Sequence, residues 1–169
     1  QKEHARTLVQ EAAALVARGG ADIVVRLPRP KRMTVRDLEA VISPAVTAIA
    51  LPKAESAQHV ELVSEIIDEI EAERGMAVGT TKMLAMVETC SAFFRIAEIA
   101  KASPRLVALN LGAEDFALSA GMLPTAEGLF MPKQTAIFAA RGAGIMPMGF
   151  IGTVAEFADL DAFRETVRR

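Results

Sequence analysis

Short runs of apolar residues alternate along this chain with longer segments that carry apolar positions at helical spacing. The runs at 23–25, 48–51, 83–87 and 106–111 are rich in aliphatic residues and have the length of strands, and a possible fifth strand covers 145–150. Continuous apolar runs of this kind are typical of strands buried on both faces. Strands that alternate with helices predict a parallel sheet, either a (β/α) barrel or a doubly wound open sheet.

The segments between the runs predict helices, and their borders carry recognisable start and stop signals. Gly19-Gly20 and Gly75 each follow the last periodic residue of a helix, Ser56 and Thr34 are expected to begin helices, and Pro132 is expected to open another. Asp37, the third residue after Thr34, would serve as a short capping-box acid. The predicted helices cover residues 3–18, 34–42, 56–74, 91–102, 114–120, 132–141 and 159–169.

The number of strands favours a barrel of which this chain carries only a part. The chain has 169 residues and is 51% apolar, which suits one core and one domain. A closed (β/α)₈ barrel needs eight strands and typically ~250 residues. No Gly-rich phosphate loop follows the first strand, which argues against a nucleotide-binding open sheet. We therefore predict an α/β (β/α)₈ TIM barrel, with residues 1–169 forming a single, partial catalytic domain of about five strands.

Composition and charge exclude several classes of function. The net charge is −2 and no Lys/Arg run is present, so we expect no nucleic-acid partner. The one compact basic group, Arg26, Arg29, Lys31 and Arg32, suits a small anionic molecule better than a polymer. A single Cys and two His make a zinc site unsuited to this chain. With no visible export signal and no run of about 20 apolar residues, we expect no membrane association and a cytoplasmic location.

Charged residues stand where the predicted strands end, which is where active groups gather in parallel βα folds. These residues are Arg26, Lys53, Glu88 and Asp115. Two carboxylates side by side at one sheet edge would form a hard oxygen site suited to Mg²⁺, and two cations would attract an anionic substrate.

Each of these residues also has a structural interpretation. Arg26 could pair with an acid at the sheet rim, and Lys53 could be a solvated loop lysine. Glu88 could cap the next helix, and Asp115 competes with Glu114 for the second ligand position, since either could be a helix-start acid.

The remaining polar and aromatic candidates are expected to be structural. His4 and His59 lie on predicted helices and suit surface roles, and Cys90 is expected to pack as a small residue. The larger apolar side chains are expected in the core: Met83, Met86, Phe93, Phe94 and Phe138.

The motifs at the strand ends resemble the citrate lyase β-subunit-like branch of the HpcH/HpaI aldolase superfamily. They are Val25-Arg26, the segment 51–56 (LPKAES), Val87-Glu88-Thr89 and the segment 111–117 (LGAEDFA). The resemblance implies a (β/α)₈ barrel that binds Mg²⁺ and cleaves or forms C–C bonds of 3-hydroxy acyl-CoA thioesters or related acids, such as citryl-CoA or malyl-CoA. It also implies a homotrimer or homohexamer.

The same resemblance assigns roles to individual residues. Glu88 and Asp115 would be the metal ligands. Arg26 and Glu88 would be catalytic, and substrate would contact Arg26, Glu88 and Lys53. The partner would be a small organic acid or an acyl-CoA thioester.

Some positions depart from the family pattern and leave alternatives open. The usual glycine after the strand-end glutamate is replaced within the segment 90–93, and Met146–Gly149 stands where an aspartate is common. An arginine expected in the preceding helix is missing, with Lys133 nearby. A class II pyruvate-type aldolase acting on a free keto acid, and a non-catalytic barrel subunit of a larger complex, are the two alternatives.

Overall fold

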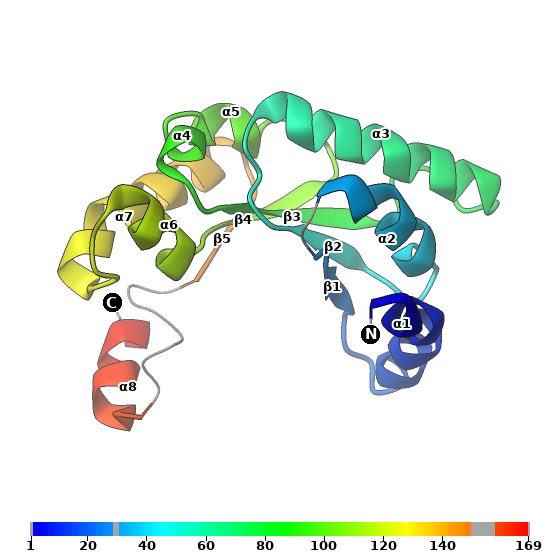
Figure 1. Ribbon diagram of the computed structural model, residues 1–169, viewed down its shortest axis with the longest axis horizontal. Helices are drawn as coiled ribbons and strands as arrows, with labels where there is room; N and C mark the ends of the chain where they lie inside the picture. Colours follow the sequence, from blue (N-terminus) through cyan, green and yellow to red (C-terminus); the bar gives the residue numbers. More distant parts are fainter. Residues whose placement is uncertain (1, 29–30, 150–157, 169) are drawn as a thin grey trace.

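A computed structural model describes residues 2–28, 31–149 and 158–168 of the chain (Figure 1). Helices and strands alternate through most of this length. The elements are α1 (Lys2–Ala17), β1 (Val24–Arg26), the 3₁₀ helix η1 (Lys31–Met33), α2 (Thr34–Val41), β2 (Ala48–Leu51), α3 (Ala57–Glu73), β3 (Lys82–Val87), α4 (Cys90–Phe93), α5 (Ile96–Ala100), β4 (Leu106–Leu111), α6 (Ala113–Ala120), α7 (Ala126–Gly142), β5 (Met146–Met148) and α8 (Leu160–Arg168).

The strands form one parallel sheet in which each strand lies beside the next one in the chain. The order is β1-β2-β3-β4-β5, and all four neighbouring pairs are parallel. Because parallel crossovers are right-handed, a sheet wound in a single direction carries its connecting helices on one face. Figure 1 shows α3, α5 and α7 along that face. The described residues thus form a five-stranded parallel α/β sheet, and the eight-stranded closed barrel stays a prediction.

The two faces of the sheet differ in what they contact. In β3, Met83, Ala85 and Val87 belong to the apolar core beneath the helices, whereas Leu84 and Met86 point to the opposite face and are only partly buried. Strand geometry forces this alternation, because successive side chains point to opposite faces. The face away from the helices is therefore the one that carries the pocket described below.

A buried ionic network joins α3 to the starts of β3 and β4. Arg105, which is 2% exposed, donates to both Glu71 and Asp68 and to the carbonyl oxygen of Thr81. Glu71 also accepts from the backbone N–H of Gly79 and of Thr81 at 2.7 and 2.6 Å. This network lies at the amino-terminal edge of the strands, the edge opposite the strand ends that carry the candidate site.

Most predicted elements are confirmed, and the strands at 48–51 and 106–111 have the predicted bounds. The fifth strand is confirmed over Met146–Met148, while Phe150, the last residue of its predicted range, lies outside the described residues. Arg29, a member of the predicted basic group, and Arg169, at the end of the last predicted helix, also lie outside them.

One predicted helix cap and one predicted helix start are wrong. Thr34 is the first residue inside α2 and not its cap; Met33 precedes the helix without a side-chain cap. Asp37 instead accepts a hydrogen bond from Arg6 of α1 at 2.7 Å. Pro132 lies inside α7, which begins six residues earlier at Ala126, because the hydroxyl of Thr125 caps it by accepting from the N–H of Gly128 at 3.2 Å.

The helix predicted at 91–102 is interrupted, and two predicted core residues are exposed. The backbone leaves the helical region at Arg95, between α4 and α5. Phe93 packs against Phe116, which places α4 against α6. The buried residues of α5 belong to the main core. Phe94, at the break, is 86% exposed, and Phe138 on the outer side of α7 is 69% exposed.

Candidate functional site

The four charged residues predicted at the strand ends come together at one edge of the sheet. Arg26 is the last residue of β1, Lys53 lies in the turn after β2, Glu88 directly follows β3, and Asp115 lies in the first turn of α6 after β4. The carboxyl ends of parallel strands meet at a common edge, which is why residues far apart in the sequence become neighbours. Their charges act on one another, since Arg26, Lys53 and Asp115 all affect the pKa of Glu88.

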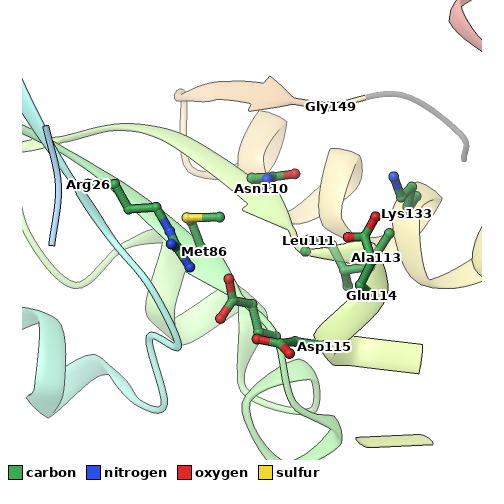
Figure 2. Close-up of a pocket in the computed structure, with 11 residues that line it drawn as sticks. Arg26, Met86, Asn110, Leu111, Ala113, Glu114, Asp115, Lys133 and Gly149 are labelled. Carbon is green, nitrogen blue, oxygen red and sulfur yellow. The ribbon is translucent and has the colours of Figure 1, made fainter. Parts of the chain in front are cut away.

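A cavity of about 380 Å³ opens at this edge (Figure 2). Its lining comes from β1, β3, β4, α6, α7 and the residue after β5. The lining residues are Arg26, Met86, Glu88, Asn110, Leu111, Gly112, Ala113, Glu114, Asp115, Lys133 and Gly149. Three of the four predicted strand-end residues line it directly, and Lys53 reaches it through Asp115.

Glu88 is the most deeply buried carboxylate of the pocket. The residue is 3% exposed, and Oε2 has no hydrogen-bond partner among the described residues. Burial raises the pKa of Glu88, and the negative charge of Asp115 raises it further; Arg26, Lys53 and the Lys53 backbone act in the opposite direction. A buried carboxylate with an unsatisfied oxygen and a like-charged neighbour would be stabilised by a cation between the two groups.

The structure removes the main structural interpretation of Glu88. Thr89, and not Glu88, caps α4, since its Oγ1 accepts from the N–H of Ala92 at 3.2 Å. The same hydroxyl donates to Glu55 Oε2 at 3.0 Å, which connects the ends of β2 and β3. Glu88 has no role in capping and points into the cavity.

Lys53 adopts a backbone conformation that is unusual for its residue type. Its φ of 49° lies in the left-handed region, which non-glycine residues rarely adopt. The ammonium group of Lys53 lies 3.0 Å from Asp115 Oδ2. Lys53 is therefore an ion-pairing residue at the mouth of the site and not a free loop lysine.

The two adjacent acids after β4 differ in their surroundings. Asp115 faces Glu88 and Lys53, whereas Glu114 is exposed and acts on Lys133. Both line the cavity, but Asp115 is the one placed beside the buried Glu88. His59, predicted as a surface residue, accepts from the N–H of Glu55 at 3.4 Å, which places it next to this strand end.

The lining residues that were not predicted as site residues include Met86, Asn110 and Lys133. Met86 was expected in the core, Asn110 lay inside an apolar run, and Lys133 was noted only as the neighbour of a missing arginine. Alternation along the strands could have found the first two, because Met86 and Glu88 share one face of β3 and Asn110 pairs with Met86 in β4. Lys133 carried no such signal, because it lies on a helix, where the alternation of a strand does not apply.

The residues present fit a hard divalent cation with few protein ligands. Within the described part of the chain, no group of three or more His, Cys, Asp or Glu side chains could enclose a metal ion. Two carboxylates do converge, and one of them has an unpartnered buried oxygen. Mg²⁺ commonly binds through one or two carboxylates and fills its other positions with water and substrate oxygens. This donor set suits Mg²⁺ and not a soft metal.

The fold and the strand-end site together define a parallel α/β protein with acidic residues at the carboxyl ends of its strands, and comparison with known proteins gives the family. The sequence profile of the HpcH/HpaI aldolase/citrate lyase family matches residues 1–169, and the chain belongs to that family. This finding confirms the resemblance seen in the strand-end motifs.

Curated relatives include two kinds of enzyme named as lyases. Citrate lyase subunit beta of Leuconostoc mesenteroides subsp. cremoris is 33% identical over 148 residues, which cover 86% of this chain and 49% of that protein. L-malyl-CoA/beta-methylmalyl-CoA lyase of Cereibacter sphaeroides is 35% identical over 143 residues, covering 72% of this chain and 43% of the relative. The chain spans about half the length of the curated relatives it matches.

Solved structures support the same architecture. CitE from Mycobacterium tuberculosis, in a complex with magnesium and acetate, superposes with a TM-score of 0.58 at 26% identity, covering 84% of this chain and 55% of that one. Malate synthase of Haloferax volcanii superposes with a TM-score of 0.80 at 16% identity, covering 99% and 52%, and shows the fold alone. Among the described residues, no helix is both long enough and apolar enough to cross a bilayer.

Proposed function

We propose that this chain carries the metal-binding half of a Mg²⁺-dependent carbon–carbon lyase built on a (β/α)₈ barrel. The reaction is the retro-aldol cleavage of a 3-hydroxy acyl-CoA thioester or a related hydroxy or keto acid. Relatives named as citrate lyase subunit beta and as L-malyl-CoA/beta-methylmalyl-CoA lyase support the reaction class, and a relative solved with magnesium supports the cofactor. A cytoplasmic location and a homotrimeric or homohexameric assembly remain predictions.

The observation that carries the proposal is the environment of Glu88. Its carboxylate is buried beside Asp115, and one of its oxygens is without a partner among the described residues. Leaving a buried carboxylate in this state costs folding free energy, so its presence at a strand end points to a bound cation. Glu88 and Asp115 would hold Mg²⁺, which when bound supplies Lewis-acid polarisation of the substrate's hydroxyl or keto oxygen.

Arg26 is suited to hold the carboxylate of the substrate. It stands across the cavity from Asp115, with its guanidinium turned toward the carboxylates (Figure 2). A planar guanidinium binds a carboxylate with two parallel hydrogen bonds, which fixes orientation as well as position. Arg26 would thus align the hydroxy-acid end of the substrate with the two acidic side chains.

The chemical step requires two proton transfers and one bond cleavage, with a base that accepts the hydroxyl proton and an acid that protonates the product enolate. The substrate hydroxyl loses its proton, the carbonyl double bond forms, and the C–C bond breaks. The electron pair of that bond passes to the thioester as an enolate, which is then protonated. Lys53 keeps a positive charge at the mouth of the site, 3.0 Å from Asp115. It would offset part of the negative charge that Glu88, Asp115 and the enolate bring together.

Substitution of the acidic residues tests the proposal. Glu88→Ala and Asp115→Asn should each abolish Mn²⁺ binding, followed by electron paramagnetic resonance, and turnover of citryl-CoA or malyl-CoA. Glu114→Gln is the matched control, because Glu114 lines the same cavity but lies beside Lys133; this variant should retain metal binding. Intact turnover in Glu88→Ala would contradict the proposal, and a substrate panel with and without CoA would separate thioester from free-acid substrates.

A further inference from the structure

Glu55, in the connection between β2 and α3, is hydrogen-bonded to the residue that follows Glu88. The hydroxyl of Thr89 donates to Glu55 Oε2 at 3.0 Å. We infer that Glu55 is a positioning residue of the metal site, which acts through Thr89 to fix the direction in which Glu88 presents its carboxylate. The role assigned to Glu55 rests on the proposed function, because it concerns a ligand of the proposed Mg²⁺ site.

Glu55 is placed to act on the site indirectly. It is not among the residues that line the cavity. Within the described part of the chain, no cluster of three or more His, Cys, Asp or Glu side chains could hold a metal ion, so Glu55 does not join Glu88 and Asp115 as a third ligand. Its carboxylate meets the hydroxyl of Thr89 instead. Groups that orient a metal ligand in this way tune the affinity of the site although they do not touch the ion.

The backbone before Glu88 is held from both neighbouring strand ends. The N–H of Ala54, after β2, donates to the carbonyl oxygen of Met86 at 2.9 Å. The N–H of Gly112, after β4, donates to the carbonyl oxygen of Val87 at 2.9 Å. The side-chain bond to Glu55 restrains the chain on the other side of Glu88. Restraint on both sides of a ligand is what keeps it within about 0.5 Å of its working position.

Glu55 is itself anchored to the start of a long helix. Ser56 caps α3, because its Oγ accepts from the N–H of His59 at 3.2 Å. The N–H of Glu55 donates to Nδ1 of the same histidine at 3.4 Å. The helix packs into the core through Val60 and Val63, which are 0% and 2% exposed. The backbone that carries the Glu55 carboxylate is therefore set by a packed helix.

The hydroxyl of Thr89 serves α4 and Glu55 at the same time. Its Oγ1 accepts from the N–H of Ala92 at 3.2 Å and donates its own proton to Glu55. A hydroxyl has one proton to donate and lone pairs to accept, so the two bonds do not compete and together favour one orientation of the side chain. Replacement of Glu55 therefore leaves the helix cap in place and removes the tie between the two strand ends.

Two substitutions separate the hydrogen bond of Glu55 from its charge. Glu55→Gln loses the charge and keeps an oxygen that can accept from Thr89, whereas Glu55→Met loses both. Mn²⁺ binding to the whole chain, followed by electron paramagnetic resonance, should weaken about 10-fold in Glu55→Met, the low end for loss of a group that orients a metal ligand. Glu55→Gln should weaken it less than ~3-fold, because a neutral hydrogen bond survives. Glu61→Met, the same change at an exposed acid of α3, should leave binding unchanged.

A double-mutant cycle tests whether Glu55 acts through the hydroxyl of Thr89. Thr89→Ser keeps the hydroxyl and should bind Mn²⁺ within ~2-fold of native protein. In a Thr89→Val background, Glu55→Met should weaken binding by less than a further ~2-fold, because the hydrogen bond is already absent. Thermal melts in a chelating buffer check that each variant folds. If Thr89→Val does not fold, the two variants of Glu55 still decide, because both keep the cap of α4.

The outcomes distinguish the positioning role from the proposed function. A Glu55→Met variant that melts earlier but binds Mn²⁺ as native protein does would show a purely structural tie and overturn the positioning role. Equal weakening by Glu55→Gln and Glu55→Met, or a full effect of Glu55→Met in the Thr89→Val background, would overturn it as well. Each of these results leaves the lyase proposal standing. Absence of Mn²⁺ binding by native protein overturns the lyase proposal and the positioning role together.

Discussion

The side chain of Glu88 fills the space beside the Cα of Gly112, so a larger residue at position 112 would clash with the Glu88 carboxylate. A Cβ built on Gly112 would lie 2.8 Å from Glu88 Cγ and 3.2 Å from Glu88 Oε1. The φ of Gly112 is −73°, so its backbone conformation is open to any residue. Glycine is therefore needed here for space and not for conformational freedom. The first residue after β4 thereby sets the position of the carboxylate that follows β3.

We predict that Gly112→Ala displaces the Glu88 carboxylate and weakens Mg²⁺ binding by at least ~10-fold. Overpacking of this kind costs about 1–3 kcal/mol in the free energy of unfolding. Isothermal titration with Mg²⁺ measures the first effect and urea denaturation the second. In a Glu88→Ala background the added methyl group meets no carboxylate, so Gly112→Ala should there cost much less. A full cost in both backgrounds would show that the methyl group clashes with something other than Glu88.

A second prediction concerns the burial of Glu88 in the absence of metal. Its pKa is raised by burial and by Asp115, so the folded state disfavours the ionised form. The favourable contribution of protonated Glu88 is complete below its unfolded pKa and is lost as the pH rises through the raised folded pKa. Glu88→Gln should therefore raise the melting temperature at pH 7 in a chelating buffer, and this gain should vanish below about pH 4. A gain that persists unchanged at low pH would contradict the raised pKa.

Added Mg²⁺ should reverse the order of stability at pH 7. A metal that binds only the folded state stabilises it by mass action, and Glu88→Gln has lost a ligand. Native protein should then gain melting temperature with Mg²⁺ concentration while the variant does not. Equal gains in both proteins would mean that the cation binds elsewhere.

The sequence was informative where one physical signal acted alone. The apolar runs predicted each strand found in the described residues, because a strand buried in a parallel sheet has little freedom in composition. The strand-end positions of Glu88 and Asp115 followed from the same runs, and the structure places the two residues together. Parallel topology thus allowed the meeting of distant residues to be predicted without coordinates.

Predictions failed where two local signals competed. Pro132 is a good first residue for a helix, but the capping hydroxyl of Thr125 begins α7 six residues earlier, at Ala126. Lys133, which the predicted helix already contained, lines the cavity. Thr34 could cap α2 with Asp37 as the capping-box acid, but Asp37 accepts a hydrogen bond from Arg6 of α1, which lies 31 residues earlier in the chain. Asn110 was hidden inside an apolar run, because composition alone does not reveal which face of the strand is lined by a cavity.

A third prediction separates two effects of Lys53 on stability, the strain of its left-handed backbone and the attraction of its ammonium group for Asp115. Left-handed geometry costs roughly 1–2 kcal/mol for a non-glycine residue, and the ion pair with Asp115 has side chains 31% and 41% exposed. Partly exposed pairs contribute less than about 1 kcal/mol. Lys53→Gly should therefore be at least as stable to urea as native protein, and Lys53→Met slightly less stable. Both variants should weaken binding of an anionic substrate equally. A Lys53→Gly variant less stable than Lys53→Met would contradict backbone strain at this position.

The final prediction concerns the buried network at the other edge of the sheet. Burial alone would raise the pKa of Glu71, but hydrogen bonds from Arg105, Thr81 and Gly79 outweigh it and lower the pKa from 4.5 to about 2. A lowered folded pKa gives stability that is present above the unfolded pKa and is lost as the pH falls from about 4.5 to about 2. The gap corresponds to roughly 3 kcal/mol.

Glu71→Gln should therefore have a free energy of unfolding about 3 kcal/mol lower than native protein at pH 7, and its urea midpoint should fall less than that of native protein between pH 4.5 and 2. Asp68→Asn is the matched control, because Asp68 pairs with the same Arg105 but its side chain is 46% exposed. This variant should lose less than about 1 kcal/mol. Glu71 is 0% exposed, so its replacement removes the fully buried partner of Arg105 and leaves only the half-exposed Asp68 to balance that charge, which is the costlier loss. If both variants kept the native acid-unfolding profile, the stabilising role of the ionised Glu71 would be wrong.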